Sequence, residues 1–304
     1  MKRGSLEYRT IGNTDLRVSV VGMDIWANAV AISSNHDEYD KIRFLQESSD
    51  LGVTLFDIGD SNKENYGEKL LSKSLKQHRH EMVVSAKCEC ICGTEQISQS
   101  TGRHGEDFST EFIRRSCEDS LIALGTDYID IYLIKCMPSH TYAHDTDIWL
   151  EALRSLVKEG KVRHIGVSID SQLALIDKYL NNQADVILAP YSILNRDVLD
   201  QLGQDTEITN TSVLCKDSSG HMSLSKGSLL GVNSDLSNRV EKIKELAFTW
   251  DIKLEKIALD FCLRNPYVCS IFPVVEDTIS LMSLCNAIDD GYVPDDLMIE
   301  VSTI

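Results

Sequence analysis

The sequence lacks several features that would assign it to a particular class of protein. No apolar run approaches the roughly 18 residues that a membrane-spanning helix needs, and no signal-like apolar segment follows Met1-Lys2-Arg3. Basic residues are scarce, since 30 Lys and Arg stand against 47 Asp and Glu, which gives a formal net charge of −17. Such a chain repels phosphate backbones and anionic bilayers. We therefore expect a cytoplasmic protein that binds neither nucleic acid nor a membrane.

Cysteine gives no sign of a disulfide framework, because the 9 cysteines are odd in number and spread along the chain. One cluster stands out, Cys88-Glu89-Cys90-Ile91-Cys92. In a strand, these cysteines would share one face and could bind a soft metal together. No matching second pair accompanies them, so we expect packed thiols and no metal site.

The order of the expected elements indicates the architecture. Short β-branched segments alternate with longer helical ones, which is typical of βαβ units and a parallel sheet. The strands after the first are expected at 52–57, 81–87, 128–134, 163–168, 186–189, 211–215 and 269–272. The glycine-rich G-x-G-x-x-G loop of a doubly wound open sheet, the alternative architecture, is missing after the first strand. With no linker or repeat to divide the chain, we predict an α/β fold, a single (β/α)8 TIM barrel domain over residues 1–304.

Five segments carry a resemblance to a known family. They are Glu7–Thr14, Gly52–Asp57, Leu124–Tyr132, Glu159–Ser168 and Tyr191–Arg196. In order and spacing they resemble the aldo-keto reductases. The resemblance implies a (β/α)8 barrel whose members reduce carbonyl compounds with NADPH, using an Asp, a Tyr, a Lys and a His at the C-terminal mouth.

Only half of that catalytic tetrad is kept. By resemblance, Asp57 and Lys87 occupy the Asp and Lys positions, whereas Asn62 stands at the Tyr position and Lys135 at the His position. An asparagine cannot donate a proton near neutral pH. Four other side chains are candidate replacements, although each can equally be an ordinary surface or loop residue: Tyr66, His140, Tyr142 and His144.

The positions that hold the nicotinamide in the family are also altered. Ser168 is kept, but Ile169 and Leu188 replace two amide side chains that bind the carboxamide. Tyr191 is assigned to the stacking position, where a tyrosine also packs well without a ligand. We regard Ser168 and Tyr191 as vestigial cofactor-binding residues.

The positions that bind the cofactor's phosphate groups in the family carry negative charge in this chain. Asp217 falls in the loop that cradles the diphosphate in the family, and Glu276 stands where a basic side chain would pair with the adenosine 2′-phosphate. A carboxylate beside a phosphate replaces attraction with repulsion. We therefore expect no cofactor, with NADP(H) as the alternative.

The residues that remain define the expected chemistry. Asp57, Lys87 and Lys135 end neighbouring strands, so they should meet at one mouth. A lysine beside another cation loses proton affinity, and its free amine can act as a nucleophile or base. We therefore expect a non-redox enzyme with lysine-based lyase, isomerase or cyclisation chemistry on a small carbonyl or anionic substrate. The Asp57–Lys87 pair can also be a purely inherited ion pair.

Two alternatives stay open. One is a non-catalytic pseudoenzyme that binds a ligand or a protein partner, and the other is an atypical NADP(H)-dependent carbonyl reductase.

Overall fold

The fold was analysed in a computed structural model. It describes residues 6–25, 27–28, 37–58, 65–89, 109–136, 146–169, 184–202, 211–216 and 234–304. None of the helices in these ranges combines the length and apolarity that crossing a bilayer requires.

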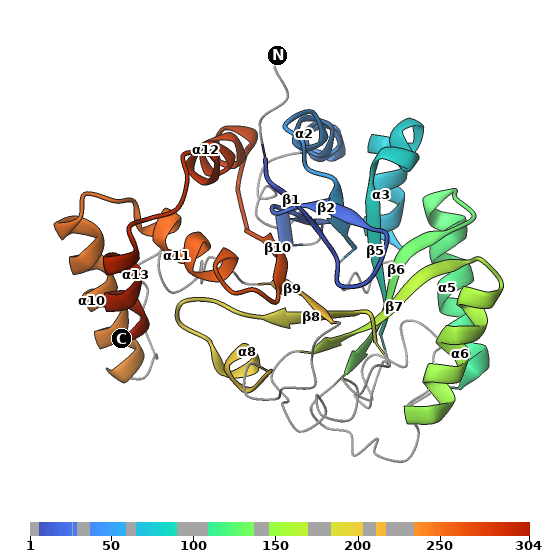
Figure 1. Ribbon diagram of the computed structural model, residues 1–304. Helices are drawn as coiled ribbons and strands as arrows, with labels where there is room; N and C mark the ends of the chain where they lie inside the picture. The colour runs from blue at the N-terminus through green and yellow to red at the C-terminus, as the bar shows by residue number, and fades with distance from the viewer. Residues whose placement is uncertain are drawn as a thin grey trace.

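The central element is a parallel sheet, and its neighbouring strands follow one another in the chain (Figure 1). Its strands are β3 (Met23–Asp24), β4 (Leu55–Asp57), β5 (Val83–Glu89), β6 (Ile129–Cys136), β7 (Val162–Ile169), β8 (Val186–Pro190), β9 (Ser212–Lys216) and β10 (Val268–Phe272). A parallel bridge between Val21 and Ile271 brings the first and last of these strands together. The predicted (β/α)8 barrel is therefore confirmed.

Helices surround the sheet on its outer side (Figure 1). They are α2 (Glu38–Asp50), α3 (Tyr66–Leu75), η1 (Lys76–Glu81), α5 (Thr110–Leu124), α6 (Thr146–Lys158), α8 (Asp197–Leu202), α10 (Ser234–Thr249), α11 (Leu254–Leu263), α12 (Thr278–Asp289) and α13 (Asp295–Ser302). Helix α5 illustrates how the sequence sets these boundaries. The Ser109 hydroxyl accepts a hydrogen bond from Phe112 N at 3.2 Å, and Gly125 ends the helix with φ of 65°.

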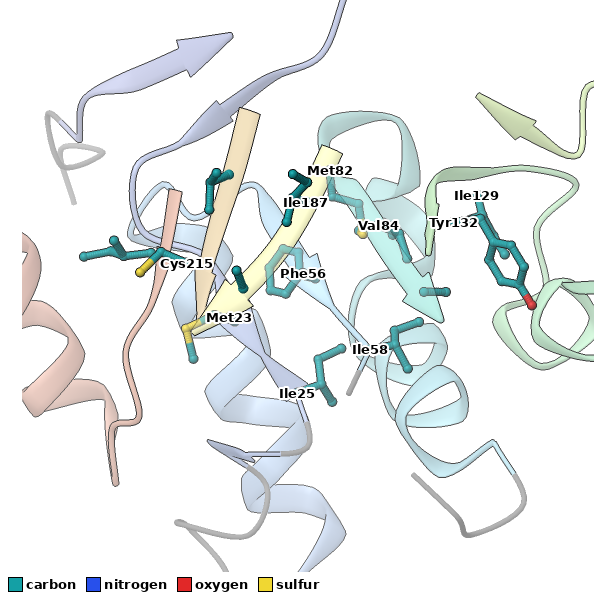
Figure 2. Close-up of a cluster of buried hydrophobic side chains, with 14 of the residues drawn as sticks. Met23, Ile25, Phe56, Ile58, Met82, Val84, Ile129, Tyr132, Ile187 and Cys215 are labelled. Atoms are coloured by element: carbon teal, nitrogen blue, oxygen red, sulfur yellow. The ribbon is translucent and has the colours of Figure 1, made fainter. Parts of the chain in front are cut away.

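Alternation along the strands separates two apolar clusters. The larger cluster lies between the sheet and the helices, and Figure 2 shows part of it, including Phe56, Val84 and Ile187. The smaller cluster is formed by the residues adjacent to these on the same strands, such as Leu55, Val83 and Val186. This smaller cluster is the interior of the barrel.

An N-terminal hairpin, β1 (Tyr8–Thr10) and β2 (Arg17–Ser19), covers the N-terminal end of the barrel. Its apolar residues Ile11, Leu16 and Val18 belong to the interior cluster. The backbone N–H of Gly12 donates to Ser212 Oγ at 2.6 Å, at the start of β9. Because the hairpin occupies this end, a ligand reaches the interior from the C-terminal ends of the strands.

Candidate active site

The strand alternation determines which polar side chains enter the barrel at its C-terminal mouth. Asp57 lies two residues after interior Leu55, and Lys135 lies two residues after interior Leu133. Side chains two apart on a strand share a face, so both point inward. The same rule turns inward Lys87 of β5, Ser168 of β7 and Lys216 of β9.

Asp57 and Lys87 form an ion pair at this mouth. Lys87 Nζ lies 2.5 Å from Asp57 Oδ2 and 3.5 Å from the carbonyl oxygen of Ile58. The Lys87 side chain is 7% exposed and the Asp57 side chain is 1% exposed. A pair this buried is strongly oriented, and removing one partner leaves an uncompensated charge in the interior. The structure thus brings together the two tetrad positions that the sequence retains.

Lys135 and Ser168 point into the barrel at the same C-terminal mouth. Lys135 is 8% exposed and is paired with Ser168 in the β6–β7 register. Ser168 is 1% exposed, and its hydroxyl oxygen has no hydrogen-bond partner among the residues that the structure describes. Buried hydroxyl groups in folded proteins are nearly always hydrogen-bonded. An unsatisfied hydroxyl at a barrel mouth therefore indicates a contact that a ligand or a water supplies.

Tyr191 is not brought to this mouth. It follows β8 on the face opposite to interior Leu188, and its ring stacks on Phe261 of α11 with centroids 5.6 Å apart. Its hydroxyl accepts a hydrogen bond from Asn265 Nδ2 at 3.3 Å. These contacts account for the burial of Tyr191 without any ligand.

The candidate replacement donors divide into two groups. Tyr66 begins α3, packs against the outer cluster and lies under Lys41 Nζ, 5.7 Å from the ring centroid. These contacts do not place its hydroxyl at the Asp57–Lys87 pair. The other three candidates, His140, Tyr142 and His144, lie outside the described residues. The tetrad position Asn62 and the loop residue Asp217 lie outside them as well.

Two further inward residues, Ser85 and Lys216, are not predicted from the sequence. Ser85 is fully buried and paired with Asp57 in the β4–β5 register, and Lys216 ends β9 beside Phe272 of β10. The alternation of apolar residues along β5 and β9 would have identified both. The resemblance directed attention to the tetrad positions instead.

The helix that follows β10 carries carboxylates at its N-terminus. Asp277 Oδ1 accepts a hydrogen bond from Ser280 N at 2.7 Å, and this bond lowers the pKa of Asp277. The exposed Glu276 precedes it, and the Thr278 hydroxyl donates to Glu47. In (β/α)8 barrels, phosphate groups often bind at the loops after the seventh and eighth strands and at a nearby helix N-terminus. Here the N-terminus of α12 is already capped by an anion.

The mouth therefore suits the nicotinamide end of a dinucleotide, near Ser168, better than a phosphorylated adenosine end near the N-terminus of α12. The unsatisfied Ser168 hydroxyl suits a carboxamide group, which both donates and accepts hydrogen bonds. Leu188 packs in the barrel interior and offers no such bond. The carboxylates around α12 suit the hydroxyl groups of an unmodified ribose and repel a 2′-phosphate.

The cysteines give no metal site in the part of the chain that the structure describes, where no three His, Cys, Asp or Glu residues cluster suitably. Cys88 is buried on the outward face of β5, while Cys90 and Cys92 lie outside the described residues. Burial raises the pKa of Cys117, Cys269 and Cys285 to about 12. These three thiols are unreactive near neutral pH.

Comparison with known proteins identifies the class that the barrel and its mouth define. The model of the aldo/keto reductase family matches residues 27–290. The chain belongs to this family.

Among curated relatives, L-galactose dehydrogenase of Arabidopsis thaliana is 30% identical over 65% of this chain and 60% of its own length. The NADH-specific methylglyoxal reductase of Escherichia coli is 29% identical over 63% of this chain and 61% of its own length. The chain thus aligns with about three fifths of each of these relatives. A solved aldo-keto reductase of Bacillus halodurans in its holo form superposes with a TM-score of 0.82 at 24% identity, covering 98% of this chain and 96% of that one.

These comparisons correct two expectations drawn from the sequence. The relatives are named as dehydrogenases and reductases, so the expectation of a non-redox enzyme is wrong. The expectation of no cofactor is wrong as well, since one relative of this aldo/keto reductase chain is named as an NADH-specific reductase. In the sequence alone, each altered cofactor position indicates a lost cofactor contact. The sequence does predict that Asp57 and Lys87 meet at the mouth, but it cannot show that the buried Ser168 hydroxyl is left unsatisfied there.

Proposed function

We propose that this protein is an NAD(P)H-dependent oxidoreductase that interconverts a carbonyl group and an alcohol in a small molecule. The observation that carries the proposal is the buried Asp57–Lys87 ion pair, with 2.5 Å between Nζ and Oδ2, at the mouth of the barrel. Family membership supports it.

The chemistry follows from where charge develops in the reaction. A bound nicotinamide supplies or accepts the hydride. In the reductive direction, negative charge grows on the carbonyl oxygen, and the Lys87 ammonium stabilises that charge and donates the proton. Asp57 orients the ammonium group, and Lys135 adds a second positive charge at the same mouth. The Ser168 hydroxyl would hold the carboxamide of a bound nicotinamide and so help to orient it.

The relatives suggest the substrate class. One is named for L-galactose, one for methylglyoxal and another, from Escherichia coli, for L-glyceraldehyde 3-phosphate. We propose a small aldehyde, α-oxo aldehyde or sugar as the substrate of this chain. The positive charges of Lys87 and Lys135 at the mouth favour a substrate with electron-rich oxygen atoms.

The test combines dinucleotide binding with turnover. Binding of NADH and NADPH is followed by quenching of tryptophan fluorescence, since Trp149 is buried and Trp250 packs against the core. Turnover is followed as loss of NADH absorbance with methylglyoxal and glyceraldehyde. The Lys87→Met variant should lower kcat by about 10²–10³-fold, the range typical for losing one transition-state donor.

Two controls separate catalysis from folding. Lys87→Met leaves Asp57 as a buried unpaired charge, so Asp57→Asn/Lys87→Met is made alongside it to remove both charges. Lys73→Met removes an exposed lysine that pairs with Glu38 on the outer helices and should leave kcat unchanged. Absence of both dinucleotide binding and turnover in the folded wild-type protein would contradict the proposal.

A further inference from the structure

Within the part of the chain that the structure describes, two buried oxygen atoms on β4 and β5 lack hydrogen-bond partners, one on Asp57 itself and one on the neighbouring Ser85. Asp57 uses Oδ2 for Lys87, while its Oδ1 has no partner. The Ser85 hydroxyl oxygen also has none. Asp57 is 1% exposed and Ser85 is 0% exposed, so bulk water does not satisfy either group.

The register places the two residues that carry these atoms side by side. Asp57 and Ser85 are direct neighbours across β4 and β5, which are parallel strands about 4.8 Å apart. Lys87 lies two residues beyond Ser85 on the same face of β5 and bonds to Asp57, so all three side chains occupy the barrel interior. Ser85 Oγ and Asp57 Oδ1 are therefore within the reach of one bridging molecule.

The chemistry of the two groups identifies the bridge. A carboxylate only accepts hydrogen bonds, whereas a hydroxyl group donates one and accepts another. Buried polar atoms without protein partners are commonly satisfied by an internal water that bonds to several such groups. A water between Asp57 Oδ1 and Ser85 Oγ donates to the carboxylate and satisfies both atoms.

We propose that Ser85 is a positioning residue of the Asp57–Lys87 pair, and that it acts through one internal water bonded to Asp57 Oδ1. This inference rests on the proposed function for its effect on catalysis. When Lys87 gives its proton to the substrate oxygen, Asp57 loses the positive charge that faces Oδ2. The bridged water then keeps the carboxylate ionised and in place until Lys87 regains a proton from solvent.

The first test measures catalysis in variants of Ser85. Ser85→Ala should lower kcat about tenfold, change KM little, and move the acid limb of the kcat–pH profile to higher pH, because the carboxylate becomes harder to keep ionised. Ser85→Thr retains the hydroxyl group and should restore the wild-type profile. A purely structural role predicts otherwise: Ser85→Ala, which replaces the hydroxyl group by a hydrogen atom, would then change only the free energy of unfolding and leave the pH profile in place.

Ser270→Ala is the matched control. Ser270 is also 0% exposed and lies in the barrel sheet, but its hydroxyl donates to the carbonyl oxygen of Ser19 at 2.9 Å. Its loss should lower the free energy of unfolding and leave the pH profile in place. An unchanged pH profile in Ser85→Ala would overturn the proposal.

The second test does not depend on activity. A crystal structure of the cofactor-free protein should show an ordered water within hydrogen-bond distance of Asp57 Oδ1 and Ser85 Oγ, and the Ser85→Ala crystal should lose it. Density for no such water in the wild-type crystal would overturn the inference even if the enzyme turns over. If the wild-type protein neither binds a dinucleotide nor reduces a carbonyl compound, the proposed function fails, while the crystal structures still decide whether the bridge exists.

Discussion

At the scale of single residues, the mouth is defined by unsatisfied atoms as much as by satisfied ones. Lys87 bonds to Asp57 Oδ2, whereas the buried Ser168 hydroxyl has no partner among the described residues. A buried hydroxyl without a partner costs about 1–3 kcal/mol. A ligand or water contact at this mouth would offset that cost for Ser168.

The first prediction concerns this hydroxyl. Ser168→Ala should leave the free energy of unfolding unchanged or raise it, because the unsatisfied group is removed. The same variant should bind NADH about fivefold to tenfold more weakly, the effect of losing one hydrogen bond. Urea unfolding and a fluorescence titration measure the two quantities. Destabilisation without a change in affinity would assign Ser168 a structural role only.

The resemblance located Asp57 and Lys87, but it could not find Ser85 or Lys216. Both face inward only because of the register that their strands adopt, and a slip of one residue would turn them to the helices. Tyr191 shows the converse. Its place in a family-like segment indicated a stacking role, whereas the packing of α11 supplies Phe261 as its partner.

At the scale of elements, the N-terminus of helix α12 adds negative charge after the last strand of the barrel. Its N-terminus carries Glu276 and the capping Asp277, and Glu47 of α2 binds the adjacent Thr278. Arg43 pairs with Glu47 at 2.8 Å, which leaves the two carboxylates of the loop as the net charge. A phosphate brought to this helix would meet like charges.

The second prediction follows from that charge. NADH should bind about tenfold or more tightly than NADPH, and Glu276→Lys should reverse or remove the difference. Fluorescence titrations with each dinucleotide at low and high salt measure it. Glu255→Lys, which changes an exposed acid in the first turn of α11, is the matched control and should leave the ratio unaltered. Equal affinities in the wild-type protein would show that the α12 carboxylates do not face the bound dinucleotide.

A histidine contacts the hairpin that covers the N-terminal end of the barrel. His164 Nε2 lies 3.0 Å from Asp15 Oδ1 of the hairpin, and His164 Nδ1 lies 3.5 Å from Asp185 Oδ2. Hydrogen bonding to Asp185, with a further contribution from Asp15, raises the pKa of His164 despite its partial burial. Hydrogen bonding to His164 lowers the pKa of Asp15 in turn.

The third prediction is the pH dependence of this closure. Because the folded-state pKa of His164 is raised, its contribution to the free energy of unfolding is fully present below the unfolded value of about 6.5. It is lost as pH rises through the folded pKa. The difference in stability between the wild-type protein and His164→Asn should therefore shrink as pH increases across that range. Urea unfolding at a series of pH values measures it.

His78→Asn serves as the control for this series. His78 is 57% exposed and lies 3.7 Å from Glu81, so its loss should change stability little at any pH. A difference for His164→Asn that stays constant with pH would mean that the histidine acts by packing alone.

At the scale of the whole molecule, the two ends of the chain close the structure jointly. Arg9 of the hairpin donates from one guanidinium nitrogen to the carbonyl oxygens of Leu263 and Val268, each at 2.8 Å. The bridge between Val21 and Ile271 joins the same regions through the backbone. These long-range contacts agree with a single barrel domain over 1–304, which stays a prediction, as does the absence of nucleic-acid and membrane partners.

The sequence by itself determined the barrel. Alternating β-branched and helical segments, and family segments in the right order, require only local propensity and chain connectivity, and both are written in the residue order. The tertiary structure decided which polar side chains share the mouth, because the inward face depends on strand register and on the packing of α11 and α12. It also determined which hydrogen bonds those residues form. Whether Ser168 and Ser85 are satisfied, and whether Asp57 meets Lys87 at hydrogen-bond distance, depends on atoms from strands that lie far apart in the chain.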